Sequence, residues 1–354
     1  MQIVNTLYHN ILEGEKYIHN LQVNKYETTI INNNLLKTST YYFPKEIKQY
    51  IQLHIHNKVI YNTILNGKNI QINLYTKTKY SNNKNNDIIF KILLIIYILS
   101  LYSSPSCSKN LIINIYFTPL KRLLPKNTDD ILEPIHVNGG FSLSGCNNKG
   151  EITIYREEEW YKVLIHELFH SFNLDFSRMN IDKWSTFWHT KININNQITK
   201  KNEILLFETY CEIWARILNV MLTSFFIIRN HTSYRLFLST FNDLIAIERN
   251  YSLLQCNKIY KKLQLNTMYR EKTNTICYYV FTGALMHNYK HFLKWCNLQG
   301  GLQFTNSIKN VNSFNNLIVN EYDNPKFLES MKIIDNIKSK KYKKYKKSLR
   351  MSII

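Results

Sequence analysis

Cysteine is sparse in this chain, and no two cysteines stand close together. The 354 residues include six cysteines, and none of them belongs to a CxxC pair. No zinc-finger signature is present, and neither an RNA-recognition nor a helix-turn-helix signature is found. Cysteines spread in this way are typical of proteins in a reducing, intracellular setting.

Long apolar segments are also missing. The first 17 residues, MQIVNTLYHNILEGEKY, contain acids and no long apolar core, so we predict no signal peptide and no secretion. The one membrane candidate, Ile88–Tyr102, has 15 residues and contains Lys91. Because a membrane-spanning helix needs about 20 residues, we expect a buried helix here and no transmembrane segment.

Glycine and proline are scarce, with nine and six residues, whereas Asn, Ile and Lys are used heavily. This bias is typical of an AT-rich coding sequence and carries no chemistry. Hydrophobic residues make up 45% of the chain and aromatic residues 14%, which excludes a disordered protein. A chain of this length can bury a substantial core, in one large domain or two smaller ones.

Acidic residues are outnumbered, because 25 Asp and Glu face 45 Lys and Arg, for a net charge of +20. The segment Lys338–Arg350, KSKKYKKYKKSLR, holds eight of the cations and no acid, which leaves +12 for the rest. Such a surplus of positive charge favours binding to polyanions. We expect this tail to stay outside the core as a mobile extension that binds nucleic acid or another polyanion. A role in nuclear import and a solvated end without a partner are the alternatives.

The pattern along the chain divides it into three regions. Residues 1–86 alternate short apolar runs with Asn-rich segments, which predicts an N-terminal α/β region of uncertain fold that ends in the loop Ser81–Asp87. Residues 87–300 contain the motifs described below. Residues 301–354 lose periodicity and end in the basic tail, so we expect a C-terminal extension.

Two segments before residue 157 are predicted strands. Leu111–Phe117 is rich in β-branched and aromatic residues, and Glu151–Arg156 alternates in the same way. Between them, Val137–Gly145 contains three of the nine glycines, which indicates extended backbone that something approaches closely. That neighbour is either a bound substrate or another part of the fold.

The stretch VLIHELFHSFNLDF, Val163–Phe176, carries the strongest chemical signal. The helix predicted from Glu157 onward places His166 and His170 one turn apart on one face, where two imidazoles can bind one Zn²⁺. Glu167 is rotated by about 100° from His166. It can therefore reach a water bound at the metal, as a general base must. Asn173 is a plausible end of the helix.

This HExxH sequence with uncharged neighbours resembles the zinc-binding helix of the zincin metallopeptidases. The resemblance implies an α+β fold, in which a small mixed sheet packs on the HExxH helix and a mainly helical lower subdomain follows. It also implies one zinc per chain, with His166 and His170 as ligands and Glu167 as base.

The third ligand must come from elsewhere in the chain. The metzincin pattern would need Gly at 173 and His or Asp at 176, but the chain has Asn173 and Phe176, and Asp175 is out of register by one. In LLFETYCEIWARIL, Glu208 and Glu212 are the only acids and share one helix face. Because a bare buried carboxylate is costly, we predict Glu208 as the ligand, with His189 as the alternative.

The spacing of these two acids resembles the gluzincin branch, which includes thermolysin. In that branch a Glu from a downstream helix completes the site and a second acid follows four residues later. Glu212 then steadies a histidine N–H, although a plain ion pair with Arg216 would explain it as well. The resemblance also implies a Tyr or His that steadies the oxyanion. Tyr279 is our choice for that residue, with Tyr278 beside it.

A second pair of histidines and a possible edge strand are two further candidate functional features. His287 and His291 repeat the four-residue spacing without an acid between them, which favours a partly buried helix face over a second metal site. Zincins also lay an edge strand along the cleft, where substrate backbone adds to the sheet. Either VNGGFS or EITIYR could be that strand.

These features predict a zinc-dependent metallopeptidase that acts on a protein or peptide substrate. The residue bias, the basic tail and the histidine helix together also resemble uncharacterised zincin-like proteins of large DNA viruses. That resemblance implies the cytoplasm or nucleus of a host cell, or the virion. The alternative function is a basic, nucleic-acid-associated or virion structural protein with a non-catalytic zinc site. Glu167 distinguishes the two, because a structural site needs the ligands but not the base.

Overall fold

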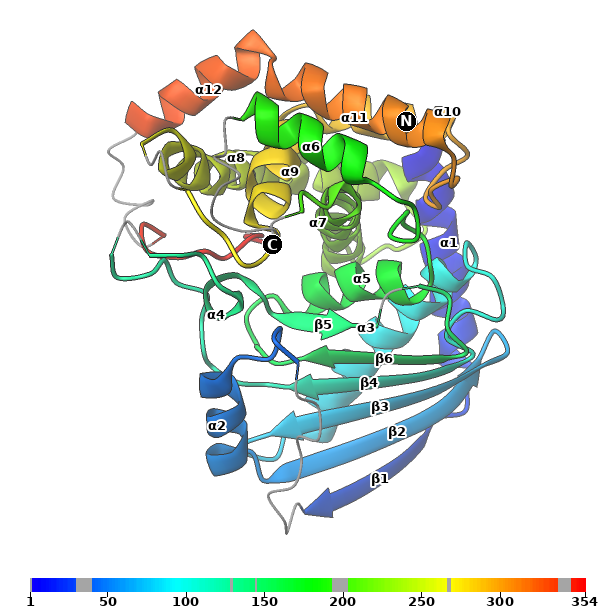
Figure 1. Cartoon of the computed structure of the whole chain (residues 1–354). Helices are drawn as coiled ribbons and strands as arrows, with labels where there is room; N and C mark the ends of the chain where they lie inside the picture. Colours follow the sequence, from blue (N-terminus) through cyan, green and yellow to red (C-terminus); the bar gives the residue numbers. More distant parts are fainter. Residues whose placement is uncertain are drawn as a thin grey trace.

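The computed structural model describes residues 2–29, 40–127, 130–143, 145–192, 203–265, 269–336 and 345–354. The fold is α+β, as predicted, with one mixed sheet and a larger set of helices (Figure 1). Within the described residues the sheet has six strands in the order β1-β2-β3-β4-β6-β5. The strands are β1 (Asn24–Thr29), β2 (Asn57–Leu65), β3 (Lys68–Thr76), β4 (Asn110–Tyr116), β5 (Gly140–Ser142) and β6 (Lys149–Ile154).

The strand directions follow from the connections. Asn66 and Gly67 both have positive φ, 48° and 73°, so this Asn-Gly pair makes the tight turn that joins β2 to β3 antiparallel. Helix α3 (Asn82–Ser100) returns the chain so that β4 pairs parallel with β3, as a crossover helix does. β4 also pairs parallel with β6, and β5 runs antiparallel on the outer side of β6.

Helices cover the sheet unequally. Helices α1 (Gln2–His19), α3 and α5 (Trp160–Ser171) share one large core with the inner side chains of the strands, such as Ile113 and Ile115. Tyr116 points to the other face, where α2 (Lys45–His54) packs in a second, smaller core. Except for the short α4, which lies beside β5, the remaining helices gather beyond α5 (Figure 1). The remaining helices are α4 (Pro134–Val137), α6 (Asp182–Lys191), α7 (Leu206–Ile227), α8 (Tyr234–Leu265), the π-helix η1 (Ile276–Phe281), α9 (Thr282–His287), α10 (Tyr289–Leu298), α11 (Ile308–Tyr322) and α12 (Pro325–Asn336).

The sheet crosses the boundary that the sequence suggests at residues 86 and 87. β3 pairs with β4 from Asn69↔Asn110 to Tyr75↔Tyr116, and the main core contains residues from Ile3 to Met351. Helix α1 and strands β1, β2 and β3 therefore belong to the same sheet and main core as the histidine helix, while α2 packs in the second core. The segment Ser81–Asp87 is not a loop either, because the Ser81 side chain accepts from the Lys84 N–H at 3.3 Å and starts α3.

Neither apolar helix lies on the outside of the protein. The run predicted as a buried helix, Ile88–Tyr102, falls almost wholly in α3, whose Ile92, Leu94 and Leu99 are completely buried. By length and composition alone α7 could cross a membrane, but 83% of its apolar window is buried inside the protein.

Two cysteines are paired, contrary to the expectation from their spacing. Cys107 and Cys146, 39 residues apart, form a disulfide, while the other four cysteines are free and buried. The two cysteines come together because they lie just before β4 and β6, which pair with each other.

The basic tail is only partly outside the core. Residues 337–344 lie outside the described residues, but residues 345–354 pack between the sheet side and the helical side of the molecule (Figure 1). Leu349 is completely buried, and Met351 is 3% exposed. The expectation of an extension free of the core is therefore wrong for residues 345–350. Lys346 and Lys347 are exposed, whereas apolar side chains and backbone amides fix the segment.

Candidate metal centre

Helix α5 begins three residues later than its acids suggest. Glu157, Glu158 and Glu159 precede the helix, and Glu159 has the left-handed φ of 61°. Its buried carboxylate pairs with Arg122 and accepts the backbone N–H groups of Met351 and Ser352. The acid at the start of this helix thus anchors a segment far along the chain.

At its other end α5 stops as predicted. Asn173 adopts φ 54°, the left-handed conformation in which Asn often ends a helix. The helix that remains has no charged residue on the side facing the core apart from the motif and Lys162. His166 and His170 therefore project from one rigid, buried element.

The three predicted ligands converge. Nε2 of His166 lies 3.1 Å from Oε2 of Glu208, Nε2 of His170 lies 3.4 Å from the same oxygen, and the two nitrogens are 3.3 Å apart. Glu208 is in the first turn of α7, which packs against α5. This triangle of two imidazole nitrogens and one carboxylate oxygen is the donor set of a catalytic zinc site.

Each histidine also has an acid on its second ring nitrogen. Oε2 of Glu212 lies 3.2 Å from Nδ1 of His166, as the spacing from Glu208 predicted. Asp175, completely buried, bonds to Nδ1 of His170. Asp175 therefore fixes the ring orientation of His170, whereas Glu212 lies near Nδ1 of His166 without hydrogen-bond geometry.

Asp175 was missed by sequence reasoning, which rejected it as a metal ligand because it is out of register. The signal was present, because it is a lone acid in an uncharged run just after the helix. Its Oδ1 accepts from the N–H and hydroxyl of Ser177 at 3.1 and 2.8 Å. These bonds hold the carboxylate where it meets His170.

Glu212 makes the ion pair with Arg216 that the sequence offered as the alternative. It accepts from Nε of Arg216 at 2.9 Å and from Nζ of Lys162 at 2.8 and 2.9 Å. All three side chains are almost completely buried, so this ion pair is not the surface arrangement that was considered. The two cations hold the pKa of Glu212 below its usual range against the effect of burial.

The electrostatics of the cluster favour a cation. Burial lowers the pKa of His166, but its hydrogen bonds with Glu208 and Glu212 outweigh burial and leave that pKa raised. Burial raises the pKa of Glu208, but His170 and His166 outweigh it and the pKa falls. A carboxylate that stays ionised between two imidazoles calls for positive charge at this point, either as protons or as a metal ion.

Glu167 faces a different neighbour. Its Oε2 accepts from the Ser142 hydroxyl at 2.7 Å. A small pocket beside it is lined by Gly139, Gly140, Val163, His166, Glu167, Glu212, Tyr278, Met351, Arg122, Asn138 and Lys162. The predicted base thus opens on the same pocket as a predicted ligand.

The edge strand beside that pocket is VNGGFS, since β5 is at the end of the sheet while EITIYR is inside it. A Cβ on Gly140 would lie 2.8 Å from the Thr153 carbonyl oxygen and 2.9 Å from a Val163 methyl. These glycines are therefore needed for close packing on β6 and α5. Among the residues that the structure describes, no strand pairs with the outer side of β5.

Tyr279, our choice for the oxyanion residue, does not reach the cluster. It is completely buried, and its hydroxyl donates to the carbonyl of Leu349. Tyr278 lies there instead, with its hydroxyl 3.1 Å from Oε2 of Glu208 and its ring 5.6 Å from that of His166. The neighbours diverge because successive residues of a helix point in different directions.

The other histidines lie away from this cluster. His189 is on α6 and is not among the described residues whose ligand atoms converge. Nε2 of His287 bonds to Ser330, while Nδ1 of His291 lies 3.0 Å from Glu321. His287 is the last residue of α9 and His291 lies in α10, so the two histidines do not share the helix face that the sequence favoured, and they face different partners.

Comparison of the chain with protein-family models, with curated proteins and with solved structures found no match. The similarity to zincins therefore rests on the residues and distances given above.

Proposed function

We propose that the protein is a zinc metallopeptidase with one Zn²⁺ held by His166, His170 and Glu208. The observation that carries the proposal is the convergence of these three donors, with an acid behind each histidine and Glu167 on the adjoining pocket. A structural zinc site normally has four protein ligands, whereas a catalytic one has three and an open position. Three donors and a pocket fit the second kind.

In the proposed reaction, Glu167, Tyr278 and β5 each have a separate role. Zinc, when bound, supplies a Lewis acid that polarises a carbonyl and makes water more acidic. Glu167 takes the proton from the attacking water and passes it to the leaving amine. The Tyr278 hydroxyl stabilises the negative charge that develops on the carbonyl oxygen. The free edge of β5 binds the substrate backbone as an added strand.

The proposal is tested by metal analysis together with digestion of an unbiased peptide library. We expect one zinc per chain and chelator-sensitive cleavage by the wild type. Zinc without any cleavage, in a protein that binds nucleic acid, would favour the alternative of a basic binding protein with a non-catalytic metal.

Glu208→Ala is expected to lose zinc, because it removes one of three ligands and leaves the two imidazoles facing each other. Metal content after dialysis against a weak chelator measures the loss. His189→Ala is the matched control, since it removes an imidazole that does not join the cluster. Full zinc in Glu208→Ala with loss in His189→Ala would reverse the assignment.

Tyr278→Phe is expected to lower kcat by roughly 10²–10³-fold, the effect of removing one oxyanion donor, while KM and zinc content change little. Tyr279→Phe serves as control, because it removes the neighbouring hydroxyl, whose bond is to Leu349. Its expected effect is on the free energy of unfolding, by about 1 kcal/mol. A larger fall in kcat for Tyr279→Phe than for Tyr278→Phe would contradict this placement.

A further inference from the structure

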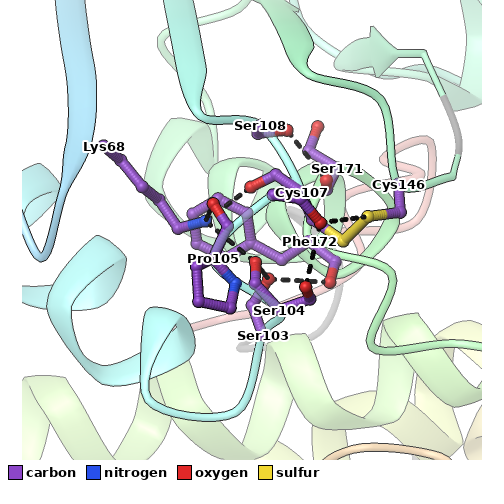
Figure 2. The surroundings of a disulfide bond; sticks show 10 residues. Lys68, Ser103, Ser104, Pro105, Cys107, Ser108, Cys146, Ser171 and Phe172 are labelled. Carbon is purple, nitrogen blue, oxygen red and sulfur yellow. Dashed lines mark hydrogen bonds between the residues drawn. A yellow bond between two sulfur atoms is a disulfide. The ribbon is translucent and has the colours of Figure 1, made fainter.

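The last turn of α5, directly after His170, is held by two loops that a disulfide joins. Figure 2 shows Cys107 and Cys146 with the residues around them. Cys107 is buried, whereas Cys146 is half-buried. The first loop follows α3, and the second follows the edge strand β5. The bond therefore links two segments that also meet through the Ser108 N–H, which donates to the Asn147 carbonyl at 2.6 Å, beside the end of the histidine helix.

These loops supply donors to three successive carbonyl groups of the helix end. The Gly145 N–H donates to His170 O at 3.3 Å, the Ser108 hydroxyl to Ser171 O at 2.8 Å, and the Ser103 hydroxyl to Phe172 O at 3.0 Å. The last carbonyls of a helix have no partner within it and must find one elsewhere. We name these three donors and the Cys107–Cys146 bond the helix-end clamp.

A buried lysine fixes the first of the two loops. Nζ of Lys68, a residue only 1% exposed, donates to the carbonyls of Ser104 and Pro105 at 3.2 and 3.4 Å and to that of Cys107 (Figure 2). The same ammonium lies 5.0 Å from the centre of the Phe172 ring, within cation–π range. Lys68 thus fixes the Cys107 side of the clamp, whereas the Cys146 side is held by the covalent bond and by the Ser108 N–H on the Asn147 carbonyl.

We propose that the Cys107–Cys146 bond is a thiol–disulfide exchange site for a small dithiol, and that its reduction loosens the end of α5 that carries His170. One thiolate of the dithiol attacks Sγ of the half-buried Cys146, and the Cys107 sulfur leaves and takes up a proton. The second thiolate then attacks the mixed disulfide and releases Cys146 as a thiol. Two electrons and two protons pass from the dithiol, which becomes a cyclic disulfide.

Reduction of the disulfide affects the metal cluster only by changing how firmly His170 is held in place. Once it is reduced, the Gly145 segment loses its covalent tie to the Cys107 loop and keeps the backbone hydrogen bond from Ser108 N–H to Asn147 O. The Gly145 N–H then leaves His170 O more often, which leaves that carbonyl with the Asn173 N–H at 3.0 Å, and the last turn of the helix opens more often. His170 is then held less firmly against Asp175 and Glu208. Partners that orient a metal-binding histidine typically change metal affinity by 10–100-fold, and we expect about tenfold weaker zinc binding in the reduced protein.

The experiment uses the full chain before and after treatment with dithiothreitol. Alkylation of the denatured protein should count four thiols before reduction, matching the four free cysteines, and six after it. Amide hydrogen exchange of residues 168–174 should become about tenfold faster on reduction, while exchange in α1 stays unchanged. Zinc retention against a weak chelator should fall in parallel.

The double variant Cys107→Ser/Cys146→Ser is the control for metal chelation by the reductant. It should exchange like the reduced wild type and should not respond to dithiothreitol. If dithiothreitol removes zinc equally from the wild type and the variant, the loss is due to chelation by the reductant. That result would overturn the link between the disulfide and zinc affinity. Unchanged exchange at 168–174 on reduction, or six thiols at the outset, would overturn the proposal without any variant having to fold. The exchange readout needs no zinc, so a protein that binds none would refute the proposed function and leave this inference standing.

Discussion

Glu167→Gln is expected to reduce peptide hydrolysis by roughly 10²–10⁴-fold, the usual contribution of a general base. Gln has the same shape as Glu but cannot accept the proton of the attacking water. The Ser142 hydroxyl can still donate to the remaining carbonyl oxygen, so the side chain should keep its place. Zinc content and the free energy of unfolding should stay close to those of the wild type. Turnover on a library-derived peptide, measured at matched zinc occupancy, gives the result.

The matched control is Glu13→Gln, the same change at an exposed position on α1. It should leave turnover, zinc and stability unchanged. If Glu167→Gln hydrolyses peptide as fast as the wild type, Glu167 is not the base and the proposed mechanism is lost. If it loses zinc as well as activity, the two effects cannot be separated, and Glu167→Asp at full zinc loading replaces it as the test.

Removing residues 345–354 is expected to destabilise the whole protein and with it the metal cluster. Leu349 is completely buried, and truncation of such a leucine alone costs about 2–5 kcal/mol. The buried carboxylates of Glu159 and Glu248 would also lose N–H donors from Met351, Ser352 and Ile353, at about 1–3 kcal/mol for each group left unsatisfied. Denaturant unfolding of Leu349→Ala measures the loss of stability from the leucine alone. Zinc content of the truncated chain shows whether the combined loss also disrupts the metal cluster.

Lys346→Ala/Lys347→Ala is the control, since both side chains are exposed. Its stability should lie within about 0.5 kcal/mol of the wild type, and its turnover should be normal. We propose that these lysines bind polyanion, so the variant should bind nucleic acid more weakly and with a shallower salt dependence, because fewer counterions are released. A truncated chain as stable as the wild type would contradict the structural role of the segment.

The sequence was most informative where spacing along one element decides geometry. His166 and His170 share a face because they lie one turn apart, and Glu208 could be chosen because it is an acid without a partner in an apolar helix. Tyr278 and Tyr279 could not be separated, since both lie in one apolar run and only the packing of η1 decides which one faces Glu208.

The features that the sequence did not reveal depend on contacts between distant segments. The Cys107–Cys146 bond requires the pairing of β4 with β6, which composition does not show. The predicted boundary at residues 86 and 87 rests on the local Asn content. The strands on its two sides, β3 and β4, nevertheless pair directly, although α3 separates them in the sequence. The tail was predicted to stay outside the core because of its lysines. Leu349 and the backbone amides that follow it determine instead where it lies.

The anchoring of Glu159 by Met351 and Ser352 also sets an order of events during synthesis. The two sides of this contact are 192 and 193 residues apart in the chain. At the usual elongation rate of about 5–20 residues per second, the ribosome needs about 10–40 s to pass from one to the other. During that interval the histidine helix exists without the donors that its N-terminal carboxylate requires. A nascent chain that already carries His166, His170 and Glu208 therefore still lacks the C-terminal contacts that hold the start of their helix.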